Sequence, residues 1–251
     1  MRKPYIGITG FMTNEEVDTI LNLMPHSSNR LLMVGVLASW KTMYENKVSG
    51  RYPNIKNIRE IFARHPLALN LIHYHTKNTD TLCDQLVSLN MFGGENLHGF
   101  QLNFAWPPIS ELAKYRSICR DYIIVMVVTN QAFEDTEYSP ELLASKIEDY
   151  KGLVDYILLD RSGGYGIYLD TEFMRKYLDV LYTKDLDVGI GVAGGLSDGT
   201  LHLVEPLMVD FPDLSIDAED KLRNPNDSLN LDFAGNYLRK ALKMPNGSKE
   251  K

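Results

Sequence analysis

Three consecutive segments have the pattern of one strand–helix–strand unit: YIIVMVVT at residues 122–129, PELLASKIEDYK at 140–151 and YILLD at 156–160. The two outer runs are short, almost wholly apolar and rich in Val and Ile, as is typical of strands covered on both faces. The middle run spaces its apolar residues as one face of a helix does. The unit therefore predicts two parallel strands joined by a helical crossover.

The same alternation extends over the whole chain. Strands are expected at 5–9, 32–38, 68–75, 99–103, 122–129, 156–160, 188–193 and 214–217, and helices at 15–24, 55–64, 80–89, 109–118, 140–151, 170–182, 199–210 and 228–242. Eight units in 251 residues give about 31 residues each, the size of one β-plus-α unit. We predict a single-domain (β/α)8 TIM barrel over residues 1–244, with a polar tail at 245–251.

An open, doubly wound sheet is the alternative architecture. Such a sheet more naturally has five to seven strands, and a dinucleotide-binding one opens with G-x-G-x-x-G. The first turn here reads GITG at residues 7–10, which does not fit that motif.

Composition narrows the classes of partner. The chain has 33 acidic and 26 basic residues and a net charge of −7. No basic stripe favours nucleic acid, and no run reaches the roughly 18 apolar residues of a membrane span. Cys83 and Cys119 cannot form a disulfide framework, and no secretory signal is evident. We expect a cytoplasmic protein whose partner is a small molecule, anionic and held by local basic or backbone N–H groups, and a monomer or homodimer.

In this fold the active site lies at the carboxyl ends of the strands. The residues at or just after the predicted strand ends are Thr9, Ser39, His75, Gln101, Asn103, Thr129, Asp160, Gly194, Gly195, Asp217 and Glu219. We expect the functional groups among these side chains.

Asp160 follows four apolar residues, so its carboxyl is expected to lose solvation and its pKa to rise, which suits a general acid. A capping or ion-paired aspartate is the alternative. Gly194 and Gly195 precede a helix, where backbone N–H groups can hold a phosphate or simply form a tight turn. Gly163 and Gly164 lie in a glycine-rich loop that either covers a ligand or is flexible.

Two histidines share one face of the third predicted strand, because His73 and His75 are two residues apart. His73 is expected to be a hydrogen-bonded core residue. His75 is a candidate base, or a metal ligand together with Asp160, Asp217 or Glu219. Gln101 and Asn103 follow the same spacing; they can hydrogen-bond a ligand or fill the barrel mouth.

Five short motifs resemble those of the phosphoribosylanthranilate isomerase family, and they follow the same order along nearly the whole chain. IGIT at 6–9 resembles C-G-I-T, SGRY at 49–52 resembles S-P-R-Y, and QLN at 101–103 resembles the start of Q-L-H-G. The fourth is LLD at 158–160 with GGYG at 163–166 and Asp170, and the fifth is AGGL at 193–196.

The resemblance implies a barrel that isomerises an N-linked ribose phosphate from an aldose to a ketose form. It implies that Asp160 is the general acid that opens the sugar ring and that Arg51 supports the site. Two positions depart from the family. Ile6 stands where the family has its basic cysteine, and the last phosphate loop, D-V-S-S-G-V-E, corresponds to DAEDKLR at 217–223.

Three hypotheses follow for the function. The first is a diverged, isomerase-like enzyme for a sugar or sugar phosphate, without cofactor or metal. It uses Asp160 as acid, His75 as replacement base, and Arg51 with Gly194 and Gly195 as the anion site. The second is a catalytically inactive, ligand-binding barrel. The third is a metal-assisted lyase or hydrolase that uses His75 with Asp160, Asp217 or Glu219.

Overall fold

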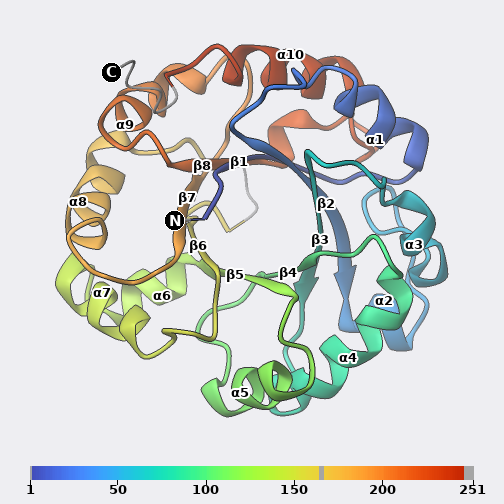
Figure 1. Cartoon of the computed structure of the whole chain (residues 1–251), viewed down its shortest axis with the longest axis horizontal. Coiled ribbons are helices and arrows are strands. Elements are labelled where there is room, and N and C mark those ends of the chain that lie inside the picture. The colour runs from blue at the N-terminus through green and yellow to red at the C-terminus, as the bar shows by residue number, and fades with distance from the viewer. Residues whose placement is uncertain (1, 164–166, 246–251) are drawn as a thin grey trace.

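Eight parallel strands close into a barrel in the computed structural model, which describes residues 2–163 and 167–245. The strands follow one another in chain order, and the helices form a ring around them (Figure 1). The closing pair is β1 with β8, where Gly7 lies opposite Asp217. The predicted single-domain (β/α)8 barrel is confirmed, while the predicted tail at 245–251 falls almost wholly outside the described residues.

The strands are β1 (Tyr5–Thr9), β2 (Leu31–Ser39), β3 (Ala68–His75), β4 (Gly99–Leu102), β5 (Ile123–Val128), β6 (Tyr156–Leu159), β7 (Gly189–Ala193) and β8 (Ser215–Ala218). The α-helices are α1 (Asn14–Leu21), α2 (Trp40–Tyr44), α3 (Ile58–Ile61), α4 (Leu82–Gly93), α5 (Ile109–Ile118), α6 (Asn130–Asp135), α7 (Pro140–Glu148), α8 (Thr171–Leu181), α9 (Glu205–Asp210) and α10 (Leu231–Ala241). Short 3-10 helices are η1 (Ile55–Asn57), η2 (Thr79–Thr81), η3 (Leu201–Leu203) and η4 (Asp220–Leu222). No helix among the described residues is long and apolar enough to cross a membrane.

Two predicted helices are each divided in the structure into a 3-10 helix and a short α-helix. The segment 55–64 forms η1 and a single turn of α3, and Phe62 after it is extended. Pro66 lies close behind, and a proline disfavours helical backbone at the residue before it. The segment 199–210 is divided into η3 and α9, with Pro206 in the first turn of α9, where a proline fits best.

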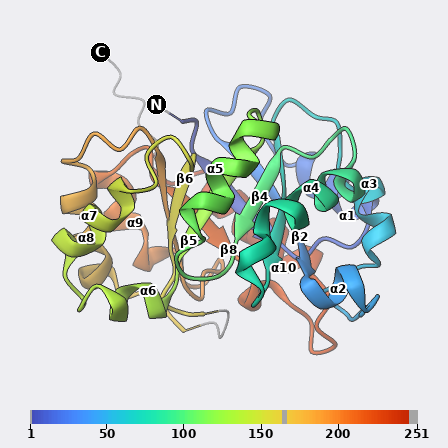
Figure 2. The same ribbon diagram turned by 90° about the horizontal axis from the view of Figure 1, so that it is seen from below.

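Helices α2 and α6 are absent from the sequence prediction. Both begin where a strand ends. Both are also so short that their few apolar residues show no helical period. The side chains of Ser39 and Thr42 cap α2 reciprocally. Figure 2 shows both helices at the end of the barrel to which the strands run, beside the loops that surround its mouth.

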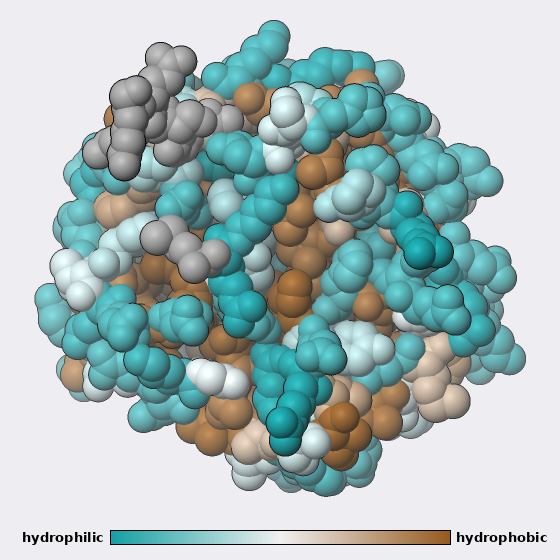
Figure 3. Space-filling view, in the orientation of Figure 1, coloured by the Kyte–Doolittle hydropathy of each residue, from teal (hydrophilic) through white to brown (hydrophobic). Residues whose placement is uncertain are grey.

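The barrel interior changes from apolar to polar along its axis. Alternate strand residues point inward, and the inner cluster consists of Tyr5, Met33, Leu69, Leu71, Val125, Val127, Tyr156, Leu158 and Ala193. Toward the carboxyl ends, the inward positions are Thr9, His73, Gln101 and Asp217, all buried. Figure 3 views the opposite face, at which the strands begin, and there apolar side chains gather toward the centre with polar ones around them.

Two inward-facing glycines make room for this polar layer. A Cβ at Gly7 would overlap the Oδ1 atom of Asp217. A Cβ at Gly35 would overlap Thr9 Oγ1 and lie 3.0 Å from His73 Nε2. Because Gly7 on β1 and Gly35 on β2 have no side chains, polar groups from β8, β1 and β3 occupy the centre of the barrel interior.

We predict that Gly7→Ala destabilises the protein by roughly 1–3 kcal/mol, because the added methyl group overpacks a filled interior. Chemical denaturation of the single variants and of Gly7→Ala with Asp217→Ala measures the coupling between the two positions. The cost of Gly7→Ala should shrink when Asp217 is already truncated. Gly199→Ala is the control, since its Cβ would meet only Ser197 Oγ at 3.7 Å; an equal cost at both glycines would contradict the steric account.

Candidate functional site

A small cavity opens at the carboxyl ends of β4 to β8. It brings together five residues predicted for the site, Gln101, Asn103, Asp160, Gly194 and Gly195. Its remaining lining residues are Val127, Leu158, Ser162, Ala193, Asp217, Glu219 and Asp220. Among the described lining residues, every charged one is an acid. We call this space the mouth cavity.

Asp217 is the most deeply buried of these acids. Its Oδ2 atom accepts a 3.3 Å hydrogen bond from Gln101 Nε2, and its Oδ1 atom has no hydrogen-bond partner among the described residues. Burial raises the pKa of Asp217 to about 8, and the carboxylates of Glu219 and Asp160 add to the effect. The group therefore holds a proton at neutral pH, although its unperturbed pKa would leave it ionised.

A line of polar groups leads away from Asp217 into the barrel. Gln101 Nε2 lies 3.2 Å from His73 Nδ1, and the hydroxyl of Thr9 lies 3.3 Å from the same ring. Burial lowers the pKa of His73 to about 3, so this imidazole is neutral. The prediction that His73 is a hydrogen-bonded core residue fits this placement. The contacts with His73 also hold the Gln101 amide against Asp217.

Asp160 follows β6 and has a different environment. Its Oδ1 atom accepts two hydrogen bonds from Ser162, one from the backbone N–H at 2.8 Å and one from the hydroxyl at 2.6 Å. Burial raises the pKa of Asp160, while both hydrogen bonds oppose that rise. Of the two carboxyl groups at the ends of β6 and β8, Asp160 therefore accepts the stronger hydrogen bonds to its charged form.

The predicted supporting arginine is already engaged by acids. Arg51 donates to both carboxylate oxygens of Asp227, with its shortest contact 2.6 Å long, and contacts Glu219 at 3.1 Å and Asp220 at 3.3 Å. Arg223 contacts the same oxygen of Glu219 at 3.0 Å. The loop after β2 is therefore tied to the loop after β8, and Arg51 offsets part of the negative charge at the rim of the mouth cavity.

Two other predicted residues lie in neighbouring spaces, and a third is not described. His75 lines a cavity at the ends of β2 and β3, and its Nδ1 atom donates to the backbone carbonyl of Asn103 at 2.8 Å. Gly163 lines a cavity of about 480 Å³ beside β6 and β7, which shares Ser162 and Gly194 with the mouth cavity. Gly164 lies outside the described residues.

Ile6 faces away from the barrel interior. It belongs to the outer cluster between strands and helices, whereas its neighbour Tyr5 belongs to the inner one. Strand alternation places Gly7 and Thr9 on the inward face of β1. The position at which the family motif has its basic cysteine therefore lies outside the barrel interior in this chain. The group beside β1 in the interior is the Asp217 carboxyl, which occupies the space over Gly7.

The donors of the metal hypothesis do not all lie in one cavity. Asp160, Asp217 and Glu219 line the mouth cavity and His75 lines another. Within residues 2–163 and 167–245, no group of three or more His, Cys, Asp or Glu side chains has the arrangement to hold a metal ion. The geometry gives no support to a metal site.

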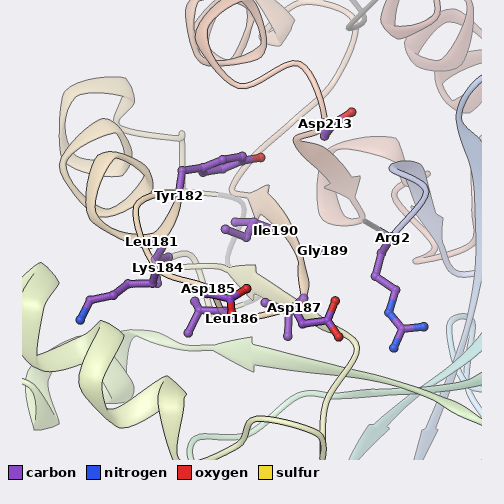
Figure 4. A pocket seen from close by; sticks show the side chains of 11 residues that line it. Arg2, Leu181, Tyr182, Lys184, Asp185, Leu186, Asp187, Gly189, Ile190 and Asp213 are labelled. Atoms are coloured by element: carbon purple, nitrogen blue, oxygen red, sulfur yellow. The ribbon is translucent and has the colours of Figure 1, made fainter.

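A further cavity lies at the opposite end of the barrel, near the start of β7. Figure 4 shows it between Arg2, Tyr182, Asp187, Ile190 and Asp213. In this fold that end contributes stability, and the chemistry occurs at the other end. We therefore place the candidate site at the mouth cavity.

The fold is similar to that of solved phosphoribosylanthranilate isomerases. The enzyme from Thermotoga maritima superposes with a TM-score of 0.66 at 16% identity, covering 95% of this chain and 98% of that one. A second such enzyme, solved with reduced 1-(o-carboxyphenylamino)-1-deoxyribulose 5-phosphate, gives 0.64 at 15% identity, with 95% and 98% covered. The tryptophan synthase A-subunit of Pyrococcus furiosus gives 0.53 at 14%, with 96% and 95% covered. No family model and no curated protein sequence matches the chain.

We predict that Asp217 makes the protein less stable as pH rises. Because the folded-state pKa lies above the unfolded one, the native state binds more protons between about pH 4 and pH 8, so the free energy of unfolding falls across that window. Relative to Asp217→Asn, the wild type should lose roughly 1–3 kcal/mol between about pH 5 and pH 8. Urea unfolding at both pH values measures this difference, and parallel pH profiles for the two proteins would rule the raised pKa out.

Proposed function

We propose that this barrel is an acid–base enzyme that isomerises a small sugar or sugar derivative between aldose and ketose forms, with Asp160 and Asp217 as its catalytic pair. The observation that carries the proposal is the pair itself. A half-buried carboxyl group and a buried one, Asp160 and Asp217, line one cavity at the carboxyl end of the barrel. Burial raises the pKa of both, and the hydrogen bonds from Ser162 oppose that rise at Asp160.

The two environments suggest a division of roles. Asp217 is protonated at neutral pH and donates its proton to an oxygen of the sugar, as ring opening requires. Burial raises the pKa of Asp160, but the two hydrogen bonds from Ser162 stabilise its charged form, so we assign to Asp160 the base that accepts the proton from C2 and returns it to C1. These roles reverse the assignment that the resemblance gives to Asp160, because the hydrogen bonds of Ser162 favour a base there.

His75 is not needed as the base in this arrangement. It lies in another cavity, and its link to the mouth is the hydrogen bond to the backbone of Asn103. Arg51 acts at a distance from the reacting atoms, since its guanidinium is occupied by Asp227, Glu219 and Asp220. We assign it a positioning role for the loop that carries Glu219.

The mouth cavity suits hydroxyl groups better than phosphate. Its four carboxyl groups accept hydrogen bonds from sugar hydroxyls, and Gln101 and Asn103 add amide donors and acceptors. Glu219 and Asp220 repel a phosphate beside Gly194 and Gly195. We therefore assign these glycines, together with Gly163 in the adjoining cavity, to the body of a sugar. The ligand of the solved isomerase is an open-chain sugar phosphate derivative, which supports the substrate class only through the shared fold.

Proton exchange at C2 is the most general test, because it is visible on the substrate itself whatever product forms. The protein is incubated in D2O with a panel of aldoses, ketoses and their phosphates, and NMR follows the loss of the C2 proton signal of each aldose and of the C1 proton signal of each ketose. We expect exchange with at least one sugar. It should fall by about 100-fold or more in Asp160→Asn and in Asp217→Asn, as is typical when a general acid or base is removed.

Lys176→Gln on α8 is the matched control and should leave exchange unchanged, with circular dichroism confirming the fold of all three variants. Exchange that persists in Asp160→Asn or Asp217→Asn would remove that residue from the proposed pair. Saturable sugar binding without exchange under any condition would instead support the inactive, ligand-binding barrel.

A further inference from the structure

The cavity at the carboxyl ends of β2 and β3 has the opposite charge to the mouth cavity. Its volume is about 430 Å³, and three of its lining residues are Lys41, Lys47 and Lys77. None of its described lining residues is acidic, in a chain that carries 33 acidic and 26 basic residues. We call this space the lysine cleft.

The three lysines are not neutralised by the protein. Across the described residues, no carboxylate oxygen lies within salt-bridge distance of any of their ammonium groups. By contrast, Arg51, only a few residues further along the same loop, contacts three acids. The same region thus contains an arginine that pairs with acids of the mouth cavity and lysines whose charge is left for a ligand.

The strands build the floor of this cleft. In the register of β2 with β3, Ser39 pairs with His75, so the two strand ends lie side by side. The Nδ1–H of His75 is committed to the carbonyl of Asn103, which leaves Nε2 for a ligand. Hydroxyl groups of Ser39 and Tyr52 also line the cleft, and burial raises the pKa of Tyr52, so its phenol stays a neutral donor.

One flat aromatic side chain completes the cleft. Trp40 lines it as the first residue of α2, and its ring packs against Tyr44 with centroids 5.0 Å apart. An indole held in this way offers a face on which the planar part of a ligand can stack. Lysine ammonium groups act as point charges that suit a compact dianion such as phosphate.

We propose that the lysine cleft binds a phosphate monoester, with Lys41, Lys47 and Lys77 around the phosphate and Trp40 against an attached ring. This site is separate from the mouth cavity and does not depend on the proposed function. It would give the barrel an anion site between β2 and β3, whereas the first hypothesis from the sequence placed the anion at Arg51 with Gly194 and Gly195.

The intrinsic fluorescence of Trp40 tests the site directly. The chain has two tryptophans, and the second, Trp106, lies elsewhere, with its indole N–H donating to Asp135. Trp106→Phe therefore leaves Trp40 as the sole tryptophan reporter. Phenyl phosphate is the probe, with phenol, benzoate and inorganic phosphate titrated beside it to separate the contributions of ring, charge and phosphate.

We expect a saturable change in Trp40 emission with phenyl phosphate, tighter than with benzoate or inorganic phosphate and absent with phenol. Replacing each lysine by Gln should weaken binding about two- to fivefold, the range for exposed ion pairs, and the triple variant should weaken it by more than about tenfold. Lysine-to-arginine variants should retain binding, and added salt should weaken it.

Lys176→Gln, outside the cleft, is the control and should bind as tightly as the parent. Asp160→Asn and Asp217→Asn should also bind phenyl phosphate normally, so failure of the catalytic pair and failure of this site are distinguishable. The proposal is overturned if Trp40 emission shows no saturable change, or if the triple lysine variant binds as tightly as Lys176→Gln.

Discussion

The site depends on one steric relationship, the Asp217 carboxyl lying over Gly7. Closure of the barrel pairs β8 with β1 and sets these two residues opposite each other. Because Gly7 has no side chain, the carboxyl of Asp217 fills the interior there, away from water. That burial raises its pKa, and the same packing sets Gln101, His73 and Thr9 in line behind it. The barrel interior is therefore apolar near the start of the strands and contains a carboxyl group with a raised pKa, that of Asp217, near their carboxyl ends.

Acidic and basic side chains lie in separate places around the mouth of the barrel. Asp160, Asp217, Glu219 and Asp220 converge on the mouth cavity. Arg51 and Arg223 contact Glu219 from the loops after β2 and β8, so the rim stays folded despite four nearby carboxyl groups. The lysines of the neighbouring cleft have no such acid partners among the described residues. This separation allows a hydroxyl-rich ligand and an anionic ligand to bind at different edges of the same barrel end.

The eight-unit alternation in the sequence predicts the barrel, because buried parallel strands and amphipathic helices each leave a clear pattern. Asp160 could be proposed from the apolar run before it. The role of Asp217 could not, since its burial depends on Gly7, which lies near the other end of the chain and pairs with it only when the barrel closes. The sequence around His75 and Asp160 also gives no indication that these two residues line different cavities. Ile6 shows a limit of motif matching, because strand alternation decides which residues of IGIT face inward, and these are Gly7 and Thr9 rather than Ile6.

The protonation state of Asp217 is the central claim of this account, and infrared difference spectroscopy measures it without any ligand. The carboxylic acid C=O stretch is followed from about pH 5 to pH 10 in the wild type and in Asp217→Asn. A protonated carboxyl that titrates with a midpoint near pH 8, present in the wild type and absent from the variant, is the result we predict. Identical spectra for the two proteins above pH 6 would show that Asp217 is ionised like an ordinary surface carboxylate, and would contradict the account.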